Sequence, residues 1–136
     1  MEKYSRTVEK FRKLLNKFKE IVENPVFPEL FKEEFLIEIT TKRFEYTYES
    51  MWKAIKEFLR KQGIECNSPK SCFSEAIKEG IIPEEYERIL SEIVMMRNRL
   101  VHIYDEESAK DLFQKIKEKE ILNTFEVSLK GLEKEI

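Results

Sequence analysis

The residues of this chain best suited to chemistry lie close together between positions 97 and 104. This stretch holds Arg97, Asn98, His102 and Tyr104, and His102 is the single histidine of the 136 residues. Histidine gains or loses a proton near neutral pH, and arginine presents paired N–H donors to phosphate or carboxylate oxygens. The stretch could therefore serve proton transfer beside an anionic group, although each residue also has a purely structural interpretation.

Arg97 occupies an unusual position for a charged residue. On a helical wheel it falls about 20° from Leu90, in the middle of an otherwise apolar stripe. The other members of the stripe are Tyr86, Ile89, Ile93, Val94, Leu100, Val101 and, if the helix persists, Tyr104. A guanidinium buried without partners is strongly destabilising. Arg97 must therefore pair with a buried acid, for which Glu45 and Glu49 are candidates, or face an interface or a cleft.

Asn98 and His102 lie four residues apart on a neighbouring face, beside the stripe. On an ideal helix His102 lies about 140° from Arg97. Joint action of the two needs a long arginine reach, a distorted helix end or a second copy of the chain. Taken alone, a histidine at this place is more often a capping or hydrogen-bonded residue near a helix C-terminus. A tyrosine such as Tyr104 more often belongs to a core.

The elements that must position these residues are all helices, because apolar residues recur three and four positions apart along most of the chain. We predict long helices over about 5–24, 28–63, 83–102 and 105–136, the last with interruptions, and a short helix over about 69–80. Ser68 and Pro69 form a typical helix start for the short one, and Gly63 a typical C-terminal cap. Residues 1–136 then form one all-α domain, an antiparallel up-and-down four-helix bundle with an additional short helix.

Composition excludes several functional classes. With 3 Gly, neither of the two common glycine-rich phosphate loops can be written. One histidine and two cysteines are too few for a structural zinc site, and we expect no metal or cofactor. Cys66 and Cys72 fit a reduced setting better than a disulfide framework, and Cys72 is expected to be an ordinary buried residue. The longest apolar run, residues 93–96, is far too short to span a membrane. We expect a soluble, cytoplasmic protein with no membrane partner.

Charge and aromatic residues give little support for nucleic-acid binding. The net charge of −2 provides no global attraction to nucleic acid, and no basic stripe is evident in the sequence. Phe44, Tyr48 and Trp52 share one stripe of the second long helix, so core packing is favoured over base stacking. Tyr46 lies off that stripe and is expected at the surface.

Residues 97–104, Arg-Asn-Arg-Leu-Val-His-Ile-Tyr, resemble the R-x-x-x-x-H-x-Y motif of the HEPN superfamily. More narrowly, the chain resembles the HepT-like group, also called nucleotidyltransferase substrate-binding proteins. Residues 43–53 are similar to the long-helix signature of that group, and residues 68–82 to its short helix. The acidic run 105–107 is also typical of it. The resemblance covers nearly the whole chain and implies an HEPN-like bundle.

The resemblance implies a toxin that is a metal-independent RNA endonuclease. An RNA 2′-hydroxyl would attack the neighbouring phosphodiester and leave a 2′,3′-cyclic phosphate. His102 would be the general acid or base, since its unperturbed pKa lies near neutrality. Arg97 would stabilise the charge on the phosphoryl group, and Asn98 would position one of these groups or donate to the phosphate.

The resemblance also implies a partner, a minimal nucleotidyltransferase that acts as antitoxin. Tyr104 occupies the place to which such a partner transfers AMP, and a bulky anion there would block phosphate entry sterically and by charge. Glu45 and Glu49 are candidate supporting residues. Arg99, opposite the apolar stripe, is expected to be solvated or to contact the RNA backbone.

The single histidine adds a constraint of its own. In-line transphosphorylation benefits from a base and an acid, so a homodimer or higher homo-oligomer would supply two Arg97–His102 pairs to one cleft. The alternative function is a non-catalytic subunit whose cleft presents a nucleotide or substrate to the partner nucleotidyltransferase. The complete set of Arg97, His102 and Tyr104 favours the nuclease, whereas the acidic charge balance counts slightly against RNA binding.

Overall fold

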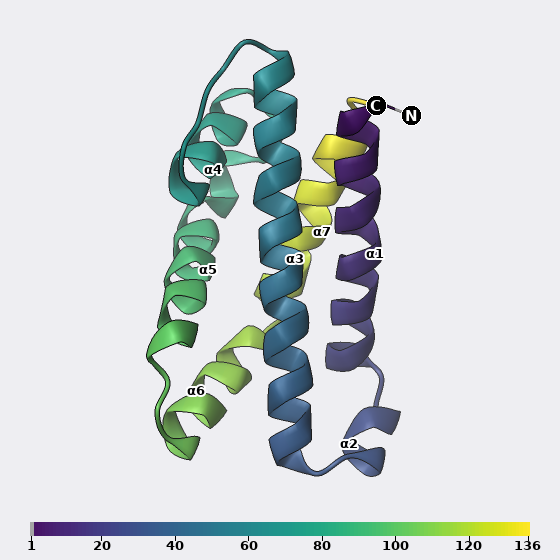
Figure 1. Ribbon diagram of the computed structural model, residues 1–136, viewed down its shortest axis with the longest axis vertical. Helices are drawn as coiled ribbons and strands as arrows, with labels where there is room; N and C mark the ends of the chain where they lie inside the picture. Colours follow the sequence, from purple (N-terminus) through teal and green to yellow (C-terminus); the bar gives the residue numbers. More distant parts are fainter. Residues whose placement is uncertain (1) are drawn as a thin grey trace.

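The computed structural model describes residues 2–136 and is helical throughout. The helices are α1 (Lys3–Glu23), α2 (Val26–Leu30), α3 (Glu33–Lys61), α4 (Pro69–Lys78), α5 (Glu87–Arg99), α6 (Glu106–Ile116) and α7 (Lys119–Glu133), with 3₁₀ turns η1 (Glu84–Tyr86) and η2 (Leu100–His102). The chain passes along the bundle in alternating directions, first as α1, then as α3, then as α4 followed by α5, and last as α6 followed by α7 (Figure 1). The predicted all-α up-and-down bundle is confirmed.

The long helix α3 is the centre of the bundle and packs against α1, α4, α6 and α7. Aromatic rings fill the core between them: the Phe18 ring lies 5.7 Å from that of Phe125 and 6.1 Å from that of Phe44. Burial of such rings contributes to the apolar stabilisation of the bundle together with the buried aliphatic side chains. Phe44 and Tyr48 are buried as predicted, and Tyr46 is 51% exposed. Among residues 2–136, no helix is long and apolar enough to cross a membrane.

Local capping explains where several helices begin and end. The Ser68 hydroxyl accepts from the Ser71 backbone N–H at 3.1 Å to start α4, and the Asp105 carboxylate accepts from the Ser108 N–H at 2.7 Å to start α6. Gly63, with φ +80°, follows the end of α3 as predicted. The predicted start of the second long helix near residue 28 is wrong, because extended backbone at Phe31 separates α2 from α3.

Cys66 and Cys72 are joined by a disulfide, with their Cα atoms 5.2 Å apart. The expectation that both are reduced, with Cys72 an ordinary buried residue, is therefore wrong for this structure. Cys66 lies in the connection after α3, and Cys72 ends the first turn of α4. The turn at the Ser68 cap brings the two side chains together, and the bridge holds the start of α4 beside the connection that follows α3.

Gly131 in α7 lies where a side chain has no room. A Cβ at this position would overlap the backbone carbonyl of Ile81, in the turn before α5. Gly131→Ala is expected to lower the free energy of unfolding by about 1–3 kcal/mol, the usual cost of overpacking, although alanine is the better helix former. Guanidinium denaturation measures the change, with the exposed neighbour Lys130→Ala as control. Equal stability of the two variants would contradict the close approach of α7 to Ile81.

Candidate functional site

Arg97 lies near the end of α5, and its side chain reaches α3. Its Nε lies 3.6 Å from Glu45 Oε2 and 3.7 Å from Glu49 Oε1. These distances are ion pairs rather than hydrogen bonds, and within residues 2–136 the buried Nε has no hydrogen-bond partner. The sequence left open whether Arg97 pairs with acids of the second long helix or faces an interface or a cleft. The structure shows that it pairs with Glu45 and Glu49 of α3. The side chain is still 26% exposed, so the arginine borders solvent and is not enclosed by the core.

Glu45 and Glu49 are fixed by neighbours on their own helix. They lie four residues apart and therefore share one face of α3. The Trp52 Nε1–H donates to Glu49 Oε2 at 3.1 Å, and Lys42 Nζ donates to Glu45 Oε1 at 3.5 Å. This arrangement leaves the other oxygen of each carboxylate facing Arg97. This role of Trp52 was not predicted. Its spacing of three residues from Glu49 places the two side chains on one face of a helix, and that spacing could have indicated the contact.

Tyr48 lies in the core behind this ion-pair cluster. Burial raises the pKa of its hydroxyl to about 12; the negative charge of Glu49 adds to the rise and the positive charge of Arg97 opposes it. The tyrosine is 2% exposed, and its ring meets that of Phe73 edge-on. Tyr48 therefore stays protonated and uncharged at neutral pH, and it packs behind the ion-pair cluster without adding a charge to it.

His102 ends a tight turn that follows α5. The α-helix stops at Arg99, and residues 100–102 continue as the 3₁₀ turn η2. A 3₁₀ turn advances about 120° per residue instead of about 100°, so the wheel positions predicted beyond Arg99 do not hold. Val101 is 59% exposed and Tyr104 is 86% exposed, which corrects the prediction that they extend the apolar stripe. His102 is exposed as well.

The other residues of the motif have free side chains. In the part of the chain that the structure describes, no side-chain hydrogen bond or ion pair involves Asn98, Arg99, His102 or Tyr104. The capping interpretation of His102 is therefore not supported. One chain brings Arg97 together with Glu45 and Glu49, but it does not join His102 or Asn98 to that cluster.

The surface around η2 combines apolar and acidic side chains. Met95 is 63% exposed and lies on α5, before the exposed Val101 and Tyr104. A groove of about 670 Å³ between the starts of α3 and α6 is lined mainly by acids: Glu33, Glu34, Glu38, Glu106 and Glu107. Over residues 2–136, no group of three or more His, Cys, Asp or Glu is placed to hold a metal ion.

The structure is thus a helical bundle in which Arg97 of α5 lies beside two acids of α3, and an exposed histidine turn follows α5. The family model described as nucleotidyltransferase substrate binding protein like matches residues 1–134, so the chain belongs to this family. The resemblance to HepT-like proteins inferred from residues 43–53 and 97–104 is confirmed. No curated protein matches the sequence.

Two solved structures share the fold. A crystal structure of a Thermus thermophilus protein superposes with a TM-score of 0.76 at 29% identity, over 90% of this chain and 98% of that one. A tri-AMPylated Shewanella oneidensis HEPN toxin in complex with MNT antitoxin superposes with a TM-score of 0.74 at 14% identity. That match covers 98% of this chain and 99% of the toxin, and at this identity it establishes the fold alone.

Proposed function

We propose that this chain is the toxin of a toxin–antitoxin pair and cleaves RNA without a metal ion. The observation that carries the proposal is the Arg97 Nε–H, which is buried beside two carboxylates yet makes no hydrogen bond within residues 2–136. The Nε faces the two carboxylates, and the exposed part of the guanidinium, within a side chain 26% exposed, is what a phosphate oxygen can reach. Family membership and the shared fold with an HEPN toxin support this choice of ligand.

The chemistry is a transphosphorylation. A neutral His102 takes the proton of an RNA 2′-hydroxyl while the 2′ oxygen attacks the adjacent phosphorus. The bond from phosphorus to the 5′ oxygen then breaks, and a protonated histidine gives that oxygen its proton, leaving a 2′,3′-cyclic phosphate and a 5′-hydroxyl. Arg97 donates to the phosphoryl oxygens as their charge rises. Glu45 and Glu49 are positioning residues that hold the guanidinium, and Asn98 orients the phosphate.

The reaction benefits from a separate acid and base, and each chain has one histidine, so the proposed site is formed by two copies of the chain. A symmetric pair brings the two η2 turns and their Arg97 side chains into one cleft. The exposed Val101 of η2 supports this arrangement, since a second copy seated on the η2 turn would cover it. Arg99, which is exposed and unpaired within the described residues, would contact the RNA backbone beside the cleft.

The partner is a minimal nucleotidyltransferase that silences the toxin at Tyr104. The phenol oxygen would attack the α-phosphate of ATP, with pyrophosphate leaving, and the adenylate would obstruct the cleft by its size and charge. At 86% exposure, the Tyr104 side chain is open to such a partner.

Tyr104→Phe is expected to retain RNA cleavage and to escape silencing, because it loses the oxygen that accepts AMP and nothing else. Co-expression with a minimal nucleotidyltransferase of the proposed class, followed by intact mass spectrometry, measures the adenylate on each protein. Tyr46→Phe, another exposed tyrosine, is the control and should be modified like the native chain. An adenylate still present on Tyr104→Phe, or silencing of its nuclease, would contradict the assignment.

The proposal is tested with purified, partner-free chain incubated with single-stranded RNA in EDTA. Cleavage by protein whose intact mass shows no adenylate is expected. Uncut RNA under these conditions would favour the alternative function, a non-catalytic subunit that presents a nucleotide to the partner. One observation supports that alternative: a single chain does not join His102 to the Arg97 cluster. Saturable binding of ATP to the chain without any RNA cleavage would establish it.

A further inference from the structure

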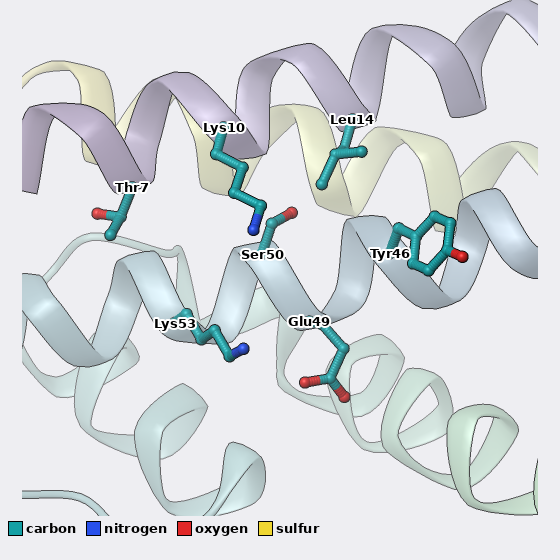
Figure 2. A pocket seen from close by; sticks show the side chains of 7 residues that line it. All are labelled: Thr7, Lys10, Leu14, Tyr46, Glu49, Ser50 and Lys53. Carbon is teal, nitrogen blue, oxygen red and sulfur yellow. The ribbon is translucent and has the colours of Figure 1, made fainter.

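A hollow of about 390 Å³ lies between α1 and α3, outside the Arg97 cluster. Lys10 and Leu14 line it from α1, and Tyr46, Glu49, Ser50 and Lys53 line it from α3. Figure 2 shows Lys10 pointing from α1 toward Ser50, with Tyr46 and Lys53 on either side along α3. We call this hollow the α1–α3 groove.

The α1–α3 groove is positively charged. Within residues 2–136, neither Lys10 nor Lys53 forms an ion pair with any carboxylate. Glu49 is the one acid among the lining residues, and it is already engaged by the Trp52 indole and by Arg97. The ammonium groups of Lys10 and Lys53 are therefore unpaired within the described residues, and the groove favours an anionic ligand.

Further lysines extend this charge along α1. A second, more open hollow of about 790 Å³ shares Lys10 and Leu14 with the groove and continues past Lys13 and Lys17. Lys10, Lys13 and Lys17 follow three-and-four spacing on one helix face and span about 10 Å of its axis; we call them the lysine row. Neither Lys13 nor Lys17 forms an ion pair in the described chain. Apolar residues, Arg12 and Asn16 stand between these lysines along the chain, so no unbroken basic run marks the row in the sequence.

The aromatic residue of the groove limits the ligand further. Tyr46 is 51% exposed, so its ring can stack on a base. A hollow of 390 Å³ is the size of a small-molecule site, which admits one nucleotide and excludes a duplex. Spaced cations beside an exposed aromatic ring are the features with which proteins hold single strands.

We propose that the α1–α3 groove and the lysine row bind single-stranded RNA outside the cleavage site. Phosphates lie on Lys10, Lys13 and Lys53, and one base stacks on Tyr46. Glu49 lines the groove, and its Oε1 lies 3.7 Å from Arg97 Nε, so this residue of α3 belongs both to the groove and to the Arg97 site. This inference rests on the proposed function in one respect, that RNA is the substrate.

The test measures binding of a fluorescein-labelled 12-nucleotide oligouridine to the His102→Ala chain by anisotropy, over about 50–200 mM KCl. The triple variant Lys10→Ala/Lys13→Ala/Lys53→Ala is expected to bind about 10–100-fold more weakly at the lower salt concentration. Its slope of log K against log salt should fall by about 2, which is about 0.7 for each lost phosphate contact.

A matched triple variant controls for the change in net charge. Lys70, Lys119 and Lys130 are exposed lysines of α4 and α7 that form no ion pair within residues 2–136. Their replacement by alanine removes the same charge elsewhere and should leave the slope unchanged. Tyr46→Ala should weaken binding about fivefold or more at an unchanged slope, whereas Tyr46→Phe should bind like its parent.

The outcomes separate this inference from the proposed function. If the groove variant and the control variant bind alike, the inference is overturned even when the native chain cleaves RNA. Equal affinity for duplex RNA would also overturn it, and so would a groove variant that changes only the oligomeric state. If the groove variant loses binding but the native chain never cleaves RNA, the groove stands and the catalytic proposal fails.

Discussion

His102→Ala is expected to lower the rate of RNA cleavage by about 10²–10⁴-fold, the range that a positioned general acid or base contributes. Its thermal unfolding midpoint should stay near that of the native chain. His102 is exposed in η2 and makes no side-chain hydrogen bond within residues 2–136, so its removal breaks no buried contact. Initial cleavage rates and circular dichroism melts of the two proteins measure both effects.

Comparing the cleavage rate of His102→Ala with its melting temperature distinguishes a catalytic histidine from a structural one. A loss of several degrees in melting temperature together with the loss of cleavage would show that His102 is structural. Cleavage at the native rate would remove it from the mechanism. His102→Gln is the matched control, because it keeps a hydrogen-bonding side chain without a group that titrates near neutral pH; it should be as slow as the alanine variant.

Arg97→Ala is expected to slow cleavage by about 10²–10³-fold, the usual effect of removing one donor to a developing phosphoryl or oxyanion charge. The loss of stability should be only about 1 kcal/mol or less. The side chains of Arg97, Glu45 and Glu49 keep 26%, 23% and 35% of their exposure, so water can solvate the acids left behind. A fully buried pair would instead cost about 3–5 kcal/mol when broken. Paired rate and denaturation measurements distinguish the two cases.

Arg97→Lys is the informative control for this variant. Lysine keeps the positive charge beside Glu45 and Glu49 but lacks the planar fork of donors. It should restore most of the stability and little of the rate. Native activity in Arg97→Lys would show that charge alone suffices, which contradicts a role for paired N–H donors at the phosphate. A mixture of native and His102→Ala chains also reports on the shared cleft: a mixed pair keeps only one histidine, so an excess of the variant is expected to lower the cleavage rate of the native chain.

The sequence was sufficient for the fold where local signals decide the structure. Ser68 before a proline and Asp105 before an acidic turn are capping signals that act within a few residues, and both helices start there. The break between α2 and α3 was not predicted, because neither glycine nor proline stands at Phe31. The bridge between Cys66 and Cys72 depends on how tightly the intervening turn folds, which their spacing does not determine.

At the site, the sequence predicted the positions of residues within α5 but not those of the residues that follow Arg99. The wheel placed Arg97 on the packed face, and Glu45 and Glu49 were candidate partners beside the alternative of an interface or a cleft; their oxygens lie 3.6 and 3.7 Å from its Nε. The exposure of Val101 and Tyr104 was missed because the α-helix tightens into η2 after Arg99. The lysine row was missed because apolar residues stand between its lysines along the chain, and only their three-and-four spacing places them on one face of α1.

The central claim is that this chain cleaves RNA by internal transphosphorylation through His102. End-group analysis tests it most directly: native and His102→Ala chains are incubated with one labelled RNA in EDTA, and the termini of the fragments are identified. We expect 2′,3′-cyclic phosphate and 5′-hydroxyl ends from the native chain and about 10²–10⁴-fold fewer fragments from the variant. Fragments with 3′-hydroxyl and 5′-phosphate ends, or equal cleavage by both chains, would contradict it.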